Sequence, residues 1–241
     1  DMLTAISAGV SAEEIILNGI SKASDAASGG RHMSNHFAKP TWNIHNVSSA
    51  TGNHTLHAAG VARAIKKYGV QAVAISSQGE SSTSEGYVYE AINGASNEKL
   101  PVVFVFQDNN YGISVHKRDQ TANWRAADNF RGFKNLRIIY CDGKNVFDSM
   151  NAMTEARKHA IEKQEPVIVH ASVVRIHSHS NSDKHELYRD DNERHCALAS
   201  DPLDRFRIIL LHSKIFSEEE LSAVDAQAQA EMMAAHRKAL A

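Results

Sequence analysis

The sequence is poor in cysteine: Cys141 and Cys196 lie far apart, in no spacing typical of a metal site. We expect Cys141, which lies in an apolar run, to be a small core residue, and a reducing compartment suits both thiols. An excess of charge is also lacking, since 26 Lys and Arg residues stand against 28 Asp and Glu residues. No apolar run approaches the roughly 20 residues that a membrane span requires. These absences argue against nucleic acid and membranes as partners and predict a soluble protein.

The length of 241 residues suits one large domain or a core with appendages. Apolar runs at residues 72–75, 102–106, 136–141 and 167–174 alternate with helical patterns such as residues 87–97. This alternation predicts an α/β fold, a parallel sheet flanked by helices on both faces. Ser11 and Ser217, each followed by glutamates, indicate two helix starts. We predict an α/β domain over residues 1–212, truncated at its N-terminus because the chain begins at Asp1, and a helical extension over residues 213–241.

Polar residues follow two of the predicted strands. Gly79 and Glu80 follow the first strand, and Asn109 follows the second. Open parallel sheets bind ligands at the carboxyl ends of their strands, so we expect Glu80 and Asn109 to face one another. The Glu80 carboxylate, the Asn109 side chain and the Tyr111 carbonyl could supply three oxygens to a magnesium ion that holds a diphosphate. The glycine turn alone is weak support, because many doubly wound domains carry one for geometric reasons.

Two short motifs give the chain a family resemblance. The Gly-Glu-Ser of residues 79–81 and the Asn-Asn-Tyr of residues 109–111 together resemble the thiamine diphosphate signature. Residues 83–86, 90–93, 100–102 and 111–114 resemble the alpha (decarboxylating) component of the 2-oxo acid dehydrogenase complexes, above all the branched-chain, 2-oxoisovalerate type. The resemblance implies a thiamine diphosphate-binding fold with thiamine diphosphate and Mg²⁺ as cofactors. Its implied cofactor-binding residues here are Gly79, Glu80, Ser81 and Asn109, and its implied metal ligands are Glu80, Asn109 and Tyr111.

The resemblance also implies a function. The family decarboxylates a 2-oxo acid on thiamine diphosphate and transfers the acyl group to lipoamide, so a branched-chain 2-oxo acid is the expected substrate. A beta component, separate or fused downstream, would be needed for activity, with a lipoyl acyltransferase core and an α2β2-type or dimeric assembly. A bacterial cytoplasmic location is expected over the mitochondrial matrix. Pyruvate or acetoin as substrate stays open, and so does a catalytically silent assembly domain, because Glu80 replaces the usual aspartate and Ser81 a glycine.

Residues 48–54 resemble the family segment that contacts the thiamine aminopyrimidine. Ser49 and Thr51 fall on the contacting positions, and His54 departs from the family's glutamine. The alternative is structural: Ser48 or Ser49 caps the helix that follows.

A histidine-rich segment follows the fourth predicted strand. It resembles the family loop that forms a wall of the active-site mouth, which makes His179 the candidate for contacting the cofactor and for proton transfer to a bound intermediate. The family pattern implies that the loop is anchored by Arg175, Asp183, Tyr188 and Arg189. One alternative is a zinc site of His177, His179, His185 and His195, although a His-x-His pair without a nearby cysteine is weak support. Another is that these histidines are solvated and have no role.

Overall fold

The computed structural model describes residues 2–46 and 49–241. It divides into two compact units, one made of Asp1–Ser49 with Leu210–Ala241 and the other of Ala50–Ile209. This division differs from the predicted one, which placed residues 1–49 with the sheet and only residues 213–241 apart. The candidate site lies within the second unit.

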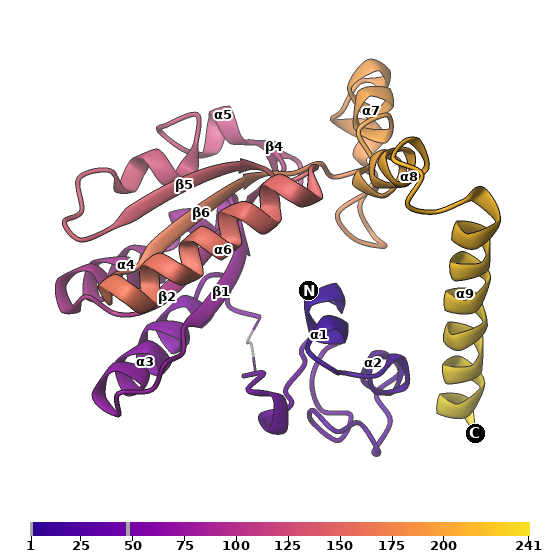
Figure 1. Cartoon of the computed structure of the whole chain (residues 1–241), viewed down its shortest axis with the longest axis horizontal. Coiled ribbons are helices and arrows are strands. Elements are labelled where there is room, and N and C mark those ends of the chain that lie inside the picture. The colour runs from indigo at the N-terminus through magenta and orange to yellow at the C-terminus, as the bar shows by residue number, and fades with distance from the viewer. Residues whose placement is uncertain (1, 47–48) are drawn as a thin grey trace. The chain divides into compact units, whose positions relative to one another are not determined.

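The second unit is built on a four-stranded parallel sheet, which confirms the predicted α/β fold (Figure 1). Its strand order is β1-β2-β6-β5. β1–α4–β2 and β5–α6–β6 run in opposite directions across the sheet, so their crossover helices lie on opposite faces. Figure 1 shows α6 on one face and α3 with α4 on the other. The elements are α3 (His54–Lys67), β1 (Ala74–Gly79), α4 (Gly86–Glu98), β2 (Val102–Asp108), β5 (Arg137–Asp142), α6 (Val146–Lys163) and β6 (Val167–Ser172).

Each face of the sheet has its own apolar core. On the α3 and α4 face, Phe104, Phe106 and Ile92 are fully buried together with Phe130. On the α6 face, β2 and β6 pack against a stripe of small residues on α6, namely Ala152, Ala156 and Ala160. These two cores fix the sheet and therefore the positions of the strand ends.

Strand β1 extends further along the chain than the sequence predicts. The strand predicted at residues 72–75 is present, but its bounds are wrong, because it comprises Ala74–Gly79. The apolar run marks only its start, whereas the later inward positions are the buried polar residues Ser76 and Gln78. Pairing with β2 continues to Gly79, which lies opposite Gln107. Gly79 is therefore the last residue of the strand and Glu80 is the first residue beyond it.

Short elements connect and follow the strands of this unit. The 3-10 helix η2 follows β1 directly, and the two-stranded hairpin β3–β4 follows β2. Helices α7 and α8 come after β6, and α8 continues across the boundary between the units. The bounds are η2 (Ser81–Ser84), β3 (Tyr111–Gly112), β4 (Val115–His116), α5 (Lys117–Gln120), η3 (Ala126–Phe130), η4 (His185–Leu187), α7 (Asp191–Leu198) and α8 (Pro202–His212).

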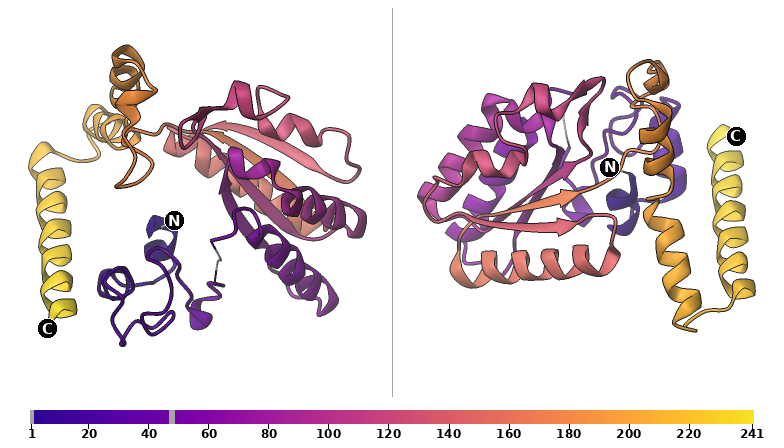
Figure 2. Two further views of the ribbon diagram at one scale, coloured as in Figure 1. Left: turned by 180° about the vertical axis from the view of Figure 1, so that it is seen from behind. Right: turned by 90° about the horizontal axis from the view of Figure 1, so that it is seen from above.

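The first unit joins the two ends of the chain. It contains α1 (Met2–Ser7), α2 (Ala12–Gly19), the 3-10 helix η1 (Pro40–Trp42) and α9 (Glu218–Leu240). The capping boxes expected at Ser11 and Ser217 are both present, with Glu14 and Glu220 as partners. Helix α9 lies alongside α2 (Figure 2), and Lys238 donates a hydrogen bond to Glu13.

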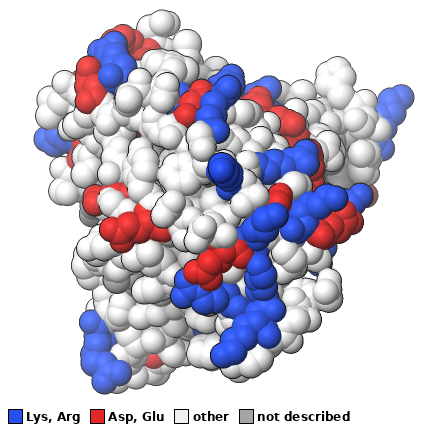
Figure 3. Space-filling view, turned by 90° about the vertical axis from the view of Figure 1, so that its left-hand side faces the viewer, with Lys and Arg blue, Asp and Glu red and all other residues white. Residues whose placement is uncertain are grey.

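Charged side chains of both signs are interspersed on the face shown in Figure 3, in keeping with a net charge of −2. Several form surface ion pairs, such as Arg63 with Glu98 and Lys99 with Glu165. Within the part of the chain that the structure describes, no helix combines the length and the apolar character needed to cross a membrane.

Candidate active site

The site lies at the carboxyl edge of the sheet, where all four parallel strands end. In the order of the sheet, the last residues of the strands are Gly79, Asp108, Ser172 and Asp142. The turns that follow β1 and β2 are neighbours, because these strands pair along their whole length. This edge is where open α/β sheets bind ligands.

Glu80 and Asn109 are in contact across this edge, through the backbone of Asn109 rather than through the side-chain amide that the sequence analysis named. The backbone N–H of Asn109 donates a hydrogen bond of 3.1 Å to Glu80 Oε2. Glu80 is only 1 % exposed, and its second oxygen, Oε1, has no hydrogen-bond partner among the described residues. Burial is the main reason that the pKa of Glu80 is raised to about 7. Burying a carboxylate oxygen without a hydrogen-bond partner costs free energy. This oxygen is therefore suited to bind a metal cation.

The Asn109 side chain lies along the turn that follows β2. Its Oδ1 accepts a hydrogen bond of 3.1 Å from the backbone N–H of Tyr111. Between them Asn110 has a φ of +72°, a left-handed conformation that asparagine tolerates better than most residues. An amide oxygen has two lone pairs, so Oδ1 keeps one for a metal ion. The Glu80 carboxylate, the Asn109 amide and the Tyr111 carbonyl are hard oxygen donors, which is the donor chemistry that a magnesium ion prefers.

Ser81 is packed tightly against the β3 strand. A Cβ atom at Gly112 would lie only 2.6 Å from Ser81 Oγ and 2.7 Å from Ser81 Cβ. The Ser81 carbonyl accepts a hydrogen bond of 3.0 Å from Gln120 Nε2, which also donates to Ser84 Oγ at 2.6 Å. The serine that departs from the family glycine is thus accommodated by a glycine opposite it and fixed by α5.

A buried polar cluster lies beside the turn, and the sequence analysis missed it. Asp108 Oδ2 lies 2.7 Å from Lys117 Nζ and 3.2 Å from His170 Nε2. Burial by itself would raise the pKa of Asp108, but the contacts with His170 and Lys117 outweigh it and hold that pKa below its usual value. The three residues come from β2, α5 and β6. Only the position of Asp108 directly before Asn109 could have suggested the cluster, because nothing in the linear sequence pairs Asp108 with the other two.

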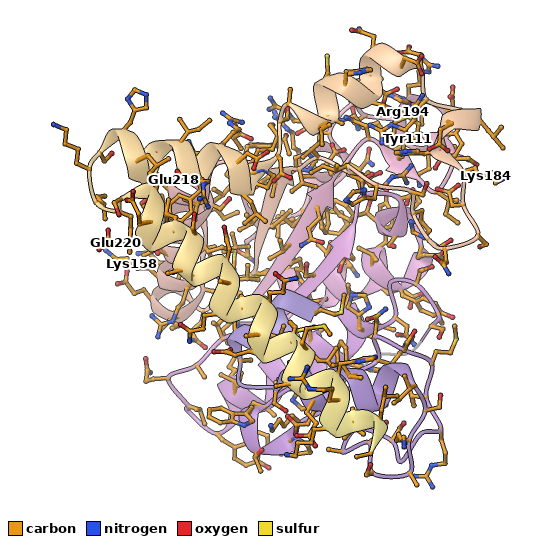
Figure 4. All side chains as sticks on the ribbon, turned by 90° about the vertical axis from the view of Figure 1, so that its right-hand side faces the viewer. Tyr111, Lys158, Lys184, Arg194, Glu218 and Glu220 are labelled. Atoms are coloured by element: carbon orange, nitrogen blue, oxygen red, sulfur yellow. The ribbon has the colours of Figure 1, made fainter. Side chains whose placement is uncertain are left out.

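Tyr111 connects the turn to the segment after β6. Its hydroxyl donates a hydrogen bond of 2.9 Å to Glu193 Oε2 in α7. The Arg175 and Arg189 guanidinium groups lie 5.4 and 5.5 Å from the centre of its ring. Figure 4 shows Tyr111 beside α7, on which Arg194 is labelled.

The four predicted loop anchors come together in the structure. Arg175 Nη2 donates to the Tyr188 hydroxyl at 2.7 Å, and that hydroxyl donates to Asp183 Oδ2 at 2.6 Å. Arg189 Nη1 donates to the Arg175 carbonyl at 2.8 Å. The hydrogen bond from Tyr188 is the main reason that the pKa of Asp183 is lowered. These contacts fix residues 175–189 against one another, and Arg175 Nη1 also reaches the Ile113 carbonyl at 2.8 Å.

His179 lies on this loop with an exposed side chain. Its backbone N–H donates a hydrogen bond of 2.8 Å to Asp183 Oδ2, which places the histidine directly beside the anchors. Its catalytic role stays a prediction. The zinc alternative gains no support, since among residues 2–46 and 49–241 no three His, Cys, Asp or Glu side chains are grouped to hold a metal ion.

The two residues expected near the aminopyrimidine fall in different units. Thr51 Oγ1 donates a hydrogen bond of 3.2 Å to Glu85 Oε1, just beyond η2. Ser49 belongs to the other unit, where its hydroxyl lies 3.0 Å from His36 Nε2. Neither is the cap of α3, whose N-cap is Asn53, and Ser48 lies outside the described residues. The cofactor contacts of Ser49 and Thr51 stay predictions.

Comparison with known proteins gives the family. The sequence pattern described as "Dehydrogenase E1 component" matches residues 1–241. The chain belongs to the dehydrogenase E1 component family. This E1 chain is 31 % identical over 219 residues to the 2-oxoisovalerate dehydrogenase subunit alpha of Bacillus subtilis, covering 91 % of the chain and 66 % of that relative. The family is thiamine diphosphate-dependent, so the expected family and organic cofactor class are confirmed.

Other relatives carry different substrate names. The pyruvate dehydrogenase E1 component subunit alpha of Staphylococcus aureus (strain Mu50 / ATCC 700699) is 34 % identical over 189 residues, which is 78 % of this E1 chain and 51 % of that relative. The mitochondrial 2-oxoisovalerate dehydrogenase subunit alpha of Mus musculus is 29 % identical over 211 residues, or 87 % and 48 %. The E1 chain thus spans about half to two thirds of the length of these relatives. Bacterial and mitochondrial proteins both occur among them, so the bacterial cytoplasmic location stays a prediction.

Proposed function

We propose that this chain is the alpha part of a 2-oxo acid dehydrogenase that decarboxylates a branched-chain 2-oxo acid and transfers the acyl group to lipoamide. The observation that carries the proposal is the meeting of Glu80 and Asn109, with a buried Glu80 oxygen that has no partner among the described residues. The branched-chain substrate follows the motif resemblance. The relatives carry both substrate names, a 2-oxoisovalerate dehydrogenase alpha subunit at 31 % identity over 91 % of the chain and a pyruvate dehydrogenase alpha subunit at 34 % over 78 %, so the assay below decides between the two substrates.

The proposed roles of the residues follow from their chemistry. Glu80, the Asn109 amide and the Tyr111 carbonyl would hold Mg²⁺, and the ion would hold the diphosphate of the cofactor. Thiamine diphosphate, when bound, supplies the electron sink for loss of carbon dioxide. Metal binding requires an ionised Glu80, which loses its proton easily near neutral pH because its pKa is about 7. His179 is the proposed proton donor or acceptor beside the substrate.

The assembly is part of the proposal. The relatives are named as alpha subunits, and a beta component and a lipoyl acyltransferase core are the proposed partners, in an α2β2-type or dimeric assembly. We expect the chain without a beta component to bind thiamine diphosphate weakly and to be inactive. Calorimetry on the chain alone and on the reconstituted assembly would measure this difference.

The decisive experiment is a reconstitution with the beta component, Mg²⁺ and thiamine diphosphate. Reduction of an artificial electron acceptor is followed with 3-methyl-2-oxobutanoate, pyruvate or acetoin as the substrate, under the same conditions. The proposal expects the branched-chain substrate to have the highest kcat/KM. A higher kcat/KM for pyruvate or acetoin would contradict the proposed specificity for a branched-chain 2-oxo acid. An assembly that forms but turns over none of the three would identify a silent assembly domain.

A further inference from the structure

The buried cluster beside the site includes an ion pair at the end of β2. Lys117 Nζ and Asp108 Oδ2 are 2.7 Å apart, and their side chains are only 7 % and 2 % exposed. The Trp124 ring covers the lysine, with its centre 4.3 Å from Nζ. His170 Nε2 approaches the same carboxylate oxygen at 3.2 Å. A lysine held between a carboxylate and an aromatic ring cannot move freely, so the orientation of the Asp108 carboxylate is fixed.

The same two residues hold the backbone of Asn110. Asp108 Oδ1 accepts a hydrogen bond of 3.1 Å from the Asn110 N–H. The backbone N–H of Lys117 donates a hydrogen bond of 2.8 Å to the Asn110 carbonyl. Both polar backbone groups of Asn110 are therefore bound by the two residues of the ion pair, one by the Asp108 carboxylate and the other by the Lys117 backbone, at the one residue of the turn with positive φ. Asn109 and Tyr111, the neighbours of Asn110, carry two of the three proposed metal ligands.

We propose that Lys117 and Asp108 act as a positioning pair, which holds the Asn109–Tyr111 turn in the conformation that presents Asn109 Oδ1 and the Tyr111 carbonyl to the metal. This inference rests on the proposed function, because it assigns a role toward the metal ion of that site. Neither residue is itself a proposed metal ligand, and both act through Asn110.

The physical case depends on where the pair is buried. A buried ion pair contributes little net stability, since the attraction between the charges is offset by the loss of their hydration. Its geometric effect is stronger, because the carboxylate that accepts from Lys117 also accepts from the turn. Residues that orient metal ligands in this way typically change metal affinity about 10-fold to 100-fold when they are replaced.

The test is the affinity of the assembled protein for Mn²⁺ in the presence of thiamine diphosphate, measured by electron paramagnetic resonance. We expect Lys117→Met to weaken Mn²⁺ binding about 10-fold to 100-fold. Lys144→Met is the matched control, since Lys144 Nζ is also 2.7 Å from an aspartate, Asp142, at the end of β5. In the sheet β5 is separated from β2 by the strand β6. This control is expected to leave Mn²⁺ affinity unchanged.

A double variant separates positioning from stability. Asp108→Asn with Lys117→Met removes both charges together, so its urea midpoint should return close to the wild-type value while Mn²⁺ affinity stays at least about 10-fold weaker. Hydrogen exchange of the Asn110 and Tyr111 amides in the ligand-free protein is a second readout. Exchange of both should be faster in the double variant than in Lys144→Met.

The outcomes are distinct. Wild-type protein that binds Mn²⁺, together with a double variant that is stable and binds it weakly, supports the inference. Equal affinity of wild type and double variant overturns the inference and leaves the proposed function standing. A wild-type assembly that binds no Mn²⁺ with thiamine diphosphate overturns the proposed function, and the positioning role is overturned with it.

Discussion

Tyr111 and Glu193 are hydrogen-bonded at 2.9 Å, although 82 residues separate them in the sequence. Tyr111 begins the β3–β4 hairpin that follows β2, whereas Glu193 lies in α7. One tyrosine therefore joins the turn of the candidate site to the segment that carries His179.

Tyr111→Phe should loosen this connection. The change removes the hydroxyl that donates to Glu193 while it keeps the ring near the guanidinium groups of Arg175 and Arg189. We expect a loss of about 1 kcal/mol of stability, as for a typical intramolecular hydrogen bond. Hydrogen exchange of residues 175–193 should become faster. Tyr87→Phe, on an exposed position of α4, is the control and should change neither quantity. Unchanged exchange in Tyr111→Phe would contradict the connection.

Glu80 should make the stability of the metal-free protein depend on pH. Its pKa in the folded state is about 7, above the usual 4.5, mainly because of burial. The folded protein therefore holds this proton more tightly than the unfolded chain, and the resulting stability is full below about pH 4.5 and is lost as pH rises through about 7. The loss amounts to about 3 kcal/mol.

Glu80→Gln should remove this dependence, because glutamine is neutral at every pH and can still accept from Asn109. Urea unfolding in EDTA between about pH 5 and pH 8 measures it. Glu90→Gln, at an exposed position of α4, is the control and should keep the wild-type slope. If Glu80→Gln and wild type lose stability in parallel over this range, burial of Glu80 is not the cause.

Gly112→Ala should destabilise the protein by about 1–3 kcal/mol, as expected for overpacking. The added methyl group would lie 2.7 Å from Ser81 Cβ, which belongs to the turn after Glu80. Adding Ser81→Gly should restore most of the loss, because it removes the opposing atoms. Gly94→Ala in α4 meets no atom within 4 Å and should stabilise the protein slightly. Thermal unfolding of the three variants and the wild type measures these effects, and a double variant as unstable as Gly112→Ala would refute the contact.

His179→Ala should reduce kcat of the reconstituted enzyme by a factor on the order of 100, as for loss of a general acid or base. The KM for the 2-oxo acid should change little if the histidine acts mainly in proton transfer. His177→Ala is the control, since His177 is exposed on the same loop. If the two variants had equal activity, His179 would have no specific role in the reaction.

The sequence predicted the parts of the fold that short-range chemistry decides. The capping boxes at Ser11 and Ser217 are present because each needs only a serine and a glutamate three residues later. The meeting of Glu80 and Asn109 could be predicted because parallel strands end at the same edge of a sheet. The extent of β1 could not, since its inward positions Ser76 and Gln78 are polar.

Contacts between residues far apart in the chain could not be predicted from the sequence. Lys238 and Glu13 are 225 residues apart, so no periodicity relates them, and the grouping of the chain's two ends was not predicted. The cluster of Asp108, Lys117 and His170 was missed for the same reason, since its members lie on three different elements. Such residues become recognisable only when the register of β2 and β6 is known.

The buried pair of Lys117 and Asp108 has a consequence for how the protein can evolve. Loss of either charge alone leaves the other buried without a partner and lowers the free energy of unfolding by about 3–5 kcal/mol. Replacing both residues with uncharged ones changes the free energy of unfolding little. Single substitutions at either position should therefore be rare, and lineages that have lost one charge should have lost its counterpart as well.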